Sequence, residues 1–405
     1  MAISITQALD IVYDKTPVVN LELLLIEEAL GRIMGEDRIA TFNLPRFDNS
    51  AMDGYAVKST DAGKAVPCVD VIYAGDDPQM ILEHGKTIKI MTGAPIPKGC
   101  EAIIPIENVT VQNKIVTLPD DISPGVNIRR SGEDIKSGTV YLHAGEKVTP
   151  YTIALLASQG VTHIWVRRKI KVAVFATGDE LRPHHEKIQP HQLYNSNTPM
   201  FLARAKQLGC EIKQIDSSAD TLESLTTSIR AAMDADIILT SGGVSMGDKD
   251  FTKEAFTSLG MQIHFDQVDI KPGKPTAFGT IGDTVIINLP GNPLASMVNY
   301  ELFVRAAIRK MSGMHSFYHQ TIETKIEEDF TLRGGKYTVR LGSYDGKTFS
   351  PFKKQLPGML SPLEKADAML ITEPHLEKLE KGRIVKILPI RWELTSAKKE
   401  EIFTR

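Results

Sequence analysis

Residues 171–313 alternate short apolar runs with amphipathic stretches, and this alternation constrains the fold more than any other feature of the chain. The stretches Leu222–Met233 and Leu294–Leu302 carry apolar residues at the period of a helix. Strands that alternate with such helices form a parallel sheet covered by its crossover helices. The pattern therefore predicts a doubly wound α/β domain. Its expected strands are Lys171–Ala176, Glu211–Ile215, Asp236–Thr240, Met261–Val268 and Thr284–Leu289.

The rest of the chain has a different texture. Residues 41–137 contain frequent Pro and Gly between short apolar runs, which indicates β structure. Ile5–Leu30 and Thr149–Gly160 show helical periodicity, and Tyr318–Ile390 again indicates strands joined by glycine turns. We therefore expect four parts: a helical hinge (residues 1–40 with 138–170), a projecting β domain (41–137), an α/β domain (171–315) and a C-terminal β domain (316–405).

Composition excludes several classes of protein. The 405 residues include 47 Lys and Arg and 50 Asp and Glu, so the charges nearly balance. No global basic field therefore attracts nucleic acid or an anionic membrane. The longest apolar runs, such as Ile153–Ala157, are far shorter than the ~20 residues that span a bilayer. Acidic Asp10 and Asp14 argue against a signal peptide, so we expect a cytoplasmic protein.

The three cysteines, Cys68, Cys100 and Cys210, lie far apart with no CxxC pair. This spacing favours small buried hydrophobes over a disulfide framework or a thiolate zinc site. The histidines His184, His185 and His191 share a polar loop, and we interpret them as surface residues.

Loops that follow parallel strands meet at one edge of the sheet, where ligands of open α/β sheets bind. The five loops expected there offer glycine N–H groups, Lys271 and Lys274, carboxylates suited to Mg²⁺, and an N-cap at Asn292 before Pro293. Neither a Walker motif nor GxGxxG is present. A phosphorylated ligand with a divalent cation fits this set, although each loop taken alone could be an ordinary turn and each lysine a surface residue. The loops are Thr177–Glu180, residues 217–220, residues 241–250, Asp269–Pro275 and Pro290–Pro293.

The expected β domain carries a second polar cluster. Phe47–Ala56 includes Asp48 and Asp53 in a run without periodicity, which core packing does not explain. Arg129 and Arg130 adjoin acids in a turn, and either a surface ion pair or anion recognition accounts for them.

Seven motifs, in their order along the chain, resemble those of the molybdopterin molybdenumtransferase family, called MoeA in bacteria and represented in animals by the C-terminal E domain of gephyrin. The resemblance runs from about residue 5 to residue 390. The motifs are Pro45–Ala56, Thr92–Pro95, Gly132–Asp134, Thr177–Leu181, Ser241–Ser245, Lys271–Pro275 and Leu289–Pro293.

The resemblance implies a last step of molybdenum cofactor synthesis, in which molybdate enters adenylylated molybdopterin and AMP is released in a Mg²⁺-dependent hydrolysis. It also implies a molybdopterin-binding α/β domain within a multidomain α/β plus β protein. The expected assembly is a homodimer whose site joins the α/β domain of one subunit to the β segment of the other. Contacts with the molybdopterin adenylyltransferase and with molybdoenzyme chaperones are further expectations.

The resemblance also implies site residues. It makes Asp53, Glu180, Asp250, Lys271 and Lys274 catalytic, with Glu180 and Asp250 holding Mg²⁺, and leaves Asp248 as an alternative to Asp250. Asp220, Arg340 and Ser361 match by approximate position only. The expected substrate-binding residues are Thr92, Asp134, Asp220, Ser241, Gly242, Gly243, Pro290, Pro293, Arg340 and Ser361.

Two other functions compete with this interpretation. A molybdopterin adenylyltransferase or another nucleotide pyrophosphatase could use the same α/β loops, but residues 41–137 and the C-terminal β domain would then have no role. A purely structural scaffold is disfavoured because the lysines and carboxylates of the sheet edge are present.

Overall fold

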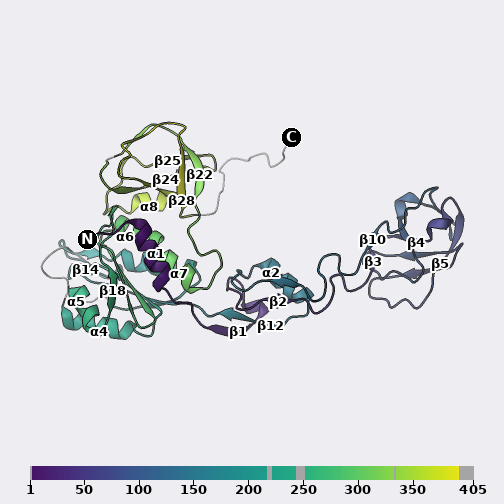
Figure 1. Ribbon diagram of the computed structural model, residues 1–405, viewed down its shortest axis with the longest axis horizontal. Coiled ribbons are helices and arrows are strands. Elements are labelled where there is room, and N and C mark those ends of the chain that lie inside the picture. The colour runs from purple at the N-terminus through teal and green to yellow at the C-terminus, as the bar shows by residue number, and fades with distance from the viewer. Residues whose placement is uncertain (1, 217–220, 243–250, 333, 392–405) are drawn as a thin grey trace. The chain divides into compact units, whose positions relative to one another are not determined.

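The computed structural model describes residues 2–216, 221–242, 251–332 and 334–391 (Figure 1). The chain divides into two compact units. The first comprises Met1–Glu22, Gly31–Ile33 and Val166–Arg405, and the second comprises Leu23–Leu30 and Met34–Trp165. Within the described part of the chain, every helix is too short or too polar to cross a bilayer.

The first unit is built on a six-stranded sheet of order β16-β13-β17-β21-β20-β18. Its first four strands run parallel, and β20 runs antiparallel to both of its neighbours. The structure confirms the strands predicted at Lys171–Ala176 and Thr284–Leu289, whereas β20 was not expected. The strands are β13 (Lys171–Ala176), β16 (Glu211–Gln214), β17 (Ile237–Ser241), β18 (Gln262–Phe265), β20 (Ala277–Ile281) and β21 (Thr284–Leu289).

Helices cover both faces of this sheet. Alternate residues of β13 point to opposite sides, with Val172 and Val174 in one core and Ala173 and Phe175 in the other. The first core contains residues of α1, α3, α6, η4 and α7, and the second contains residues of α4 and α5. The doubly wound fold is therefore confirmed. The helices are α1 (Ile5–Lys15), α3 (Asn197–Gln207), α4 (Leu222–Ala232), α5 (Phe251–Ser258), α6 (Pro293–Asn299), the π-helical turn η4 (Tyr300–Val304) and α7 (Arg305–Met311).

The helix predicted over Ile5–Leu30 is only partly correct. Helix α1 begins after Ser4, whose hydroxyl accepts from the Gln7 amide in a capping box, and it ends at Lys15. Leu21–Leu25 forms strand β1 instead, paired with β12 (His163–Arg167). Residues along β1 alternate between exposed and half-buried, which is the period of a strand. The run of leucines in β1 is the reason why the sequence indicated a helix there. The other elements of these segments are η1 (Ile26–Glu28), β2 (Arg38–Ile39), β11 (Val140–Leu142) and α2 (Pro150–Ser158).

Residues 41–137 form β structure, as their texture predicted. A six-stranded sheet has the order β7-β4-β6-β5-β9-β8, and β3 pairs with β10 in a separate two-stranded sheet. Two apolar clusters hold the sheet, one around Tyr55 and Val116 and one around Ile88 and Ile103. The elements are β3 (Asn49–Ser50), β4 (Gly54–Val57), η2 (Ser59–Asp61), β5 (Ala65–Ile72), β6 (Thr87–Ile90), β7 (Ala102–Pro105), η3 (Ile106–Asn108), β8 (Thr110–Gln112), β9 (Ile115–Thr117) and β10 (Ile128–Arg129).

The C-terminal strands close into a small barrel, because β24 pairs with both β25 and β26 and the ring β24-β25-β22-β28-β26 returns to β24. Strand β19 of the α/β domain adds to this barrel through parallel pairing of Ile270 with Tyr337 and of Lys271 with Thr338. The predicted C-terminal β domain is thus confirmed. The remaining elements are β14 (Leu181–Arg182), β15 (Leu193–Tyr194), β19 (Ile270–Lys271), β22 (Ile322–Ile326), β23 (Phe330–Thr331), β24 (Tyr337–Tyr344), β25 (Thr348–Pro351), α8 (Ser361–Lys365), β26 (Ala368–Thr372), β27 (Lys378–Leu379) and β28 (Ile384–Pro389).

Two of the three cysteines differ from the prediction. All three are free thiols, but only Cys210 is buried, while Cys68 and Cys100 are half-buried. Burial raises the pKa of Cys210 to about 12 and that of Cys100 to about 11, so both stay protonated.

Candidate active site

The first part of the site is the carboxyl edge of the parallel sheet, where β17 and β21 end side by side. The amide of Asn197, the first residue of α3, donates to Ser241 Oγ at 2.7 Å and to the Gly291 carbonyl at 2.8 Å. Asn197 is buried and its Oδ1 has no hydrogen-bond partner among the described residues. One buried amide therefore links the loops that follow both strands.

Gly242 allows two of these loops to approach closely. Its φ is +92°, and a Cβ there would lie 2.5 Å from the Thr177 carbonyl oxygen, so no other residue fits without a shift. Its N–H donates to the Leu289 carbonyl at 3.3 Å. The N–H of Gly242 is therefore used inside the fold.

Glu180 places an exposed carboxylate over the loop that follows β13. A Cβ on Gly178 would lie 2.8 Å from Glu180 Oε2, so the carboxylate lies against this glycine. No group of three His, Cys, Asp or Glu side chains that could hold a metal occurs in the described part of the chain. The predicted residues Asp220, Gly243, Asp248 and Asp250 lie outside the described residues.

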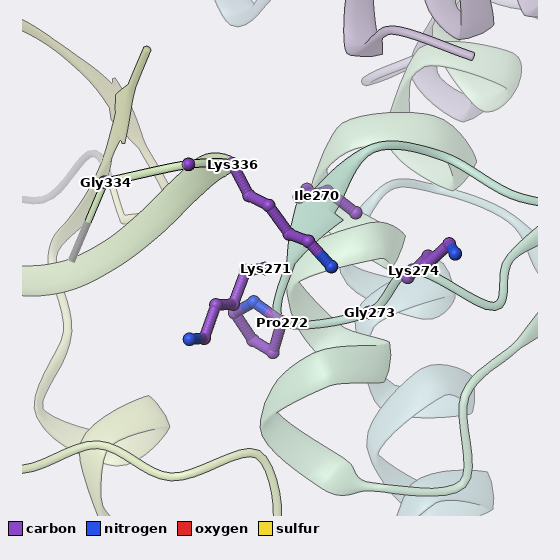
Figure 2. Close-up of a pocket in the computed structure, with 8 residues that line it drawn as sticks. Ile270, Lys271, Pro272, Gly273, Lys274, Gly334 and Lys336 are labelled. Atoms are coloured by element: carbon purple, nitrogen blue, oxygen red, sulfur yellow. The ribbon is translucent and has the colours of Figure 1, made fainter. Parts of the chain in front are cut away.

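The second part of the site is a pocket of about 420 Å³ beside the same edge. Ile270–Lys274 forms one wall, and Gly334–Lys336 at the start of the barrel forms the other. In Figure 2 the Lys336 side chain extends from the barrel toward the Ile270–Lys274 segment, and Lys271 and Lys274 extend in different directions from it. The pairing of β19 with β24 brings these two segments together, so three amines from two domains line one pocket.

A buried amide also fixes this lysine loop. Asn299 donates from Nδ2 to the Gly273 carbonyl at 3.1 Å and to the Ala295 carbonyl at 2.9 Å. A Cβ on Gly273 would lie 1.9 Å from that Nδ2 atom. Gly273 is therefore required where α6 packs against the loop.

The last predicted loop lies beside the barrel. Pro290 is buried and Pro293 begins α6, whose next residue, Leu294, donates its N–H to the Pro357 carbonyl at 2.9 Å. Asn292 is the N-cap residue, as predicted, but its side chain makes no capping hydrogen bond. Asn292 therefore stands at the predicted N-cap position without a side-chain hydrogen bond to the helix.

Arg340 and Ser361 come from the barrel domain. Arg340 lies on β24 with its guanidinium carbon 5.5 Å from the centroid of the Phe330 ring, and Ser361 is the exposed first residue of α8. Neither is among the described residues that line the lysine pocket.

The second unit carries its own polar cluster. Asp53 Oδ1 accepts from the Thr92 amide at 2.7 Å and from the Thr92 hydroxyl at 2.8 Å. These bonds, the backbone one first, lower the pKa of the Asp53 carboxyl below its ordinary value. The structure thus joins two predicted residues that are 39 positions apart in sequence.

Arg130, next to the Gly132–Asp134 turn, makes a different kind of contact. Arg130 donates to Asp48 at 2.6 Å, so this arginine forms a surface ion pair, one of the two interpretations left open. The bond from the Ser131 amide is the main cause that lowers the pKa of Asp48. Asp134 is exposed.

Three site residues of the first unit were not predicted from the sequence: Asn197, Asn299 and Lys336. Their signal in the sequence is weak, because single asparagines at helix ends are common and Lys336 follows a glycine turn. Only the pairing of distant strands shows that Lys336 faces the lysine loop.

The fold and the site define a class of multidomain protein in which a doubly wound domain and a small barrel share a lysine-lined pocket. Three family models match the chain: "MoeA N-terminal region (domain I and II)" over residues 3–160, "Probable molybdopterin binding domain" over 173–310 and "MoeA C-terminal region (domain IV)" over 324–390. A molybdopterin molybdenumtransferase of Staphylococcus epidermidis is 33% identical over 378 residues, covering 90% of each chain. One from Haemophilus influenzae is 38% identical over 296 residues, covering 72% of this chain and 73% of that one.

A solved structure agrees with these sequence matches. The molybdopterin biosynthesis moeA protein of Pyrococcus horikoshii superposes with a TM-score of 0.85 at 26% identity, over 96% of this chain and all (100%) of that one. The chain belongs to the molybdopterin molybdenumtransferase family, and it is an enzyme of molybdenum cofactor biosynthesis.

Proposed function

We propose that this enzyme transfers molybdenum from molybdate to adenylylated molybdopterin and releases AMP in a Mg²⁺-dependent hydrolysis. The observation that carries the proposal is the pocket lined by Lys271, Lys274 and Lys336 beside the sheet edge. Family membership supports the reaction, and the lysines of the pocket support binding of an anion of this kind.

Molybdate is a tetrahedral oxyanion with two negative charges. The described residues that line the pocket include three lysines and no carboxylate, so the local field favours such an anion. Lysine amines act as compact point charges with three donors each, which suits oxygens arranged around a central atom. Asn299 and Gly273 hold the loop between Lys271 and Lys274 in place, so the amines start from a fixed backbone.

The adjoining sheet edge suits the organic and phosphate parts of the substrate. Ser241 is buried and accepts from Asn197 at 2.7 Å, which leaves its own hydroxyl proton free to donate toward a ligand at the edge. We propose that a flat or anhydride-linked group of the substrate binds at the ends of β17 and β21, beside this hydroxyl.

The donor chemistry of the edge fits Mg²⁺. This cation is held by one or two carboxylates together with substrate phosphates and waters, and Glu180 presents one exposed carboxylate there. Asp250, with Asp248 as the alternative, is the proposed second ligand. When bound, Mg²⁺ neutralises charge on the phosphoanhydride. We also assign to Glu180 the role of orienting the water that attacks the adenylate phosphorus.

We also propose that the enzyme works as a homodimer in which Asp53 and Thr92 of one subunit complete the site of its partner. Leu23, Leu25, Leu30, Tyr151 and Trp165 of the second unit are exposed, which supports self-association of this unit. The free thiols support a reducing, cytoplasmic location. We also propose contacts with a molybdopterin adenylyltransferase, which would supply the substrate, and with molybdoenzyme chaperones, which would receive the product.

Release of AMP from adenylylated molybdopterin tests the proposal. We expect release that depends on both molybdate and Mg²⁺, with no consumption of ATP. Consumption of ATP with free molybdopterin would instead assign the chain to the adenylyltransferase step. AMP release that ignores molybdate would assign it to a nucleotide pyrophosphatase.

A further inference from the structure

A second pocket of about 540 Å³ lies in the first unit, apart from the site described above. It is lined by residues at the start and middle of α7, by the segment Met314–Gln320 and by the end of β28. It shares none of its described lining residues with the lysine pocket. Its size is within the range of about 300–1,000 Å³ that small-molecule sites occupy.

Arg305 forms the floor of this pocket and is only 5% exposed. Its Nη1 lies 2.8 Å from Glu301 Oε2 and donates to the Pro389 carbonyl at 2.8 Å. Its Nη2 lies 3.5 Å from Nδ1 of His319. Its Nε has no hydrogen-bond partner among the described residues. A buried guanidinium that lines a pocket thus keeps unused capacity to donate.

Positive charge exceeds negative charge around this floor. The buried Glu301 carboxylate binds both Arg305 and Arg204, the latter at 2.7 Å, and Arg309 lines the same pocket. The Glu301 carboxylate therefore pairs with two guanidinium groups, and Arg309 adds a third positive charge. Burial lowers the pKa of Arg305 to about 10 and lowers that of Arg309, and both remain charged at neutral pH. The described lining residues add no carboxylate.

His319 lies beside Arg305 and holds its guanidinium in place. Nε2 of His319 donates to the Leu302 carbonyl at 2.7 Å, so Nδ1 is the acceptor that faces Arg305. Burial lowers the pKa of His319 to about 4, so the ring is neutral and does not add to the charge. His319 therefore orients the guanidinium.

One wall of the pocket is aromatic. Tyr318 lines it and is 64% exposed, and its ring centroid lies 4.3 Å from that of Phe317 and 4.9 Å from that of Tyr13. These contacts hold an exposed ring beside the arginines. Such a ring can pack against the flat part of a bound molecule.

We propose that this pocket binds a phosphate ester of a small molecule, with the phosphate on Arg305 and Arg309 and the organic group against Tyr318. Guanidinium groups match the spacing of phosphate oxygens and pair with them more strongly than with neutral acceptors. The bound phosphate adds negative charge, because the single Glu301 carboxylate does not balance the charge of the three arginines. This site does not depend on the proposed reaction.

The test is equilibrium dialysis of radiolabelled inorganic phosphate against the full chain carrying Lys271→Ala, Lys274→Ala and Lys336→Ala. These changes remove the three amines of the lysine pocket, and the Arg309 variant then assigns the phosphate that remains bound to the second pocket. We expect one phosphate per chain, and a loss of affinity of about tenfold or more when Arg309→Gln is added. Arg230→Gln is the matched control, because Arg230 is exposed on α4, and it leaves binding unchanged.

A second arm uses phenyl phosphate as the probe. It binds more tightly than inorganic phosphate, and Tyr318→Ala removes the difference. If Arg309→Gln fails to fold by circular dichroism, Arg309→Lys replaces it and gives a smaller loss. The proposal is overturned if the lysine-free chain binds no phosphate, if the Arg309 and Arg230 variants bind alike, or if a glutamate-rich peptide binds there and phosphate does not.

Discussion

Thr92 donates two hydrogen bonds to one carboxylate oxygen of Asp53, from its amide at 2.7 Å and from its hydroxyl at 2.8 Å. Both bonds favour the charged carboxylate, so they lower its pKa. Asp53 is therefore held ionised and oriented on the surface of the second unit.

Thr92→Val should raise the pKa of the Asp53 carboxyl toward its ordinary value, because the hydroxyl donor is lost while the amide donor remains. If the ionised form is the active one, the acidic limb of the rate profile then moves to higher pH. Titration of Asp53 by carbon NMR measures the shift directly. Thr92→Ser keeps a hydroxyl and should titrate like the unmodified protein. An equal pKa in the Val and Ser variants would show that this hydroxyl does not stabilise the carboxylate.

Lys336→Ala should weaken molybdate binding by about three- to tenfold, because it removes one of three amines from a solvent-open pocket. The loss should shrink as salt screens the remaining charges. Lys347→Ala is a suitable control, since Lys347 is exposed in the turn between β24 and β25. Equal molybdate affinities in the two variants would remove Lys336 from the site.

Gly242→Ala should destabilise the fold more than Gly209→Ala does. Both glycines have a positive φ, +92° and +85°, but a Cβ on Gly209 meets no described atom within 4 Å, whereas one on Gly242 meets the Thr177 carbonyl at 2.5 Å. The shared backbone strain costs about 1–2 kcal/mol. The clash at Gly242 adds about 1–3 kcal/mol. Urea unfolding compares the two, and equal losses would mean that the two loops separate without cost.

Much of the α/β domain could be predicted from sequence, because its central strands β13, β17 and β21 are buried on both faces. Lys171–Ala176 and Thr284–Leu289 are nearly continuous apolar runs, and the structure gives them the same bounds. Strand β20 was missed because Gly279 interrupts it. That glycine is needed, since a Cβ there would lie 2.6 Å from the Gln262 carbonyl oxygen. Local pattern does not show such a contact.

The candidate site was predictable where loops follow strands and not where distant segments meet. Lys271 and Lys274 were found because strand topology brings their loop to the sheet edge. Lys336 was not, because it reaches the pocket only through pairing of β19 with β24, across 65 residues from Lys271 to Lys336. Asn197 was missed for a similar reason, since its partners Ser241 and Gly291 lie 44 and 94 positions away.

The proposed homodimer predicts complementation between two inactive variants. Asp53→Ala removes a residue that a subunit gives to its partner's site, and Lys274→Ala removes a residue of the subunit's own site. A hybrid dimer therefore keeps one intact site of two. With random subunit exchange, mixed variants should recover about a quarter of the original activity. Exchange is verified by mass spectrometry of differently tagged subunits. Verified exchange without recovery would show that both residues serve the same chain's site.

We propose that this enzyme couples release of AMP to insertion of molybdenum, and a single-turnover reaction tests this coupling most directly. Adenylylated molybdopterin, molybdate and Mg²⁺ are mixed with the enzyme, and AMP and pterin-bound molybdenum are quantified in the same sample. The account predicts equal amounts of the two products, both lost in Lys271→Ala, Lys274→Ala double variants. AMP formed without pterin-bound molybdenum, or formed equally well without molybdate, would contradict it.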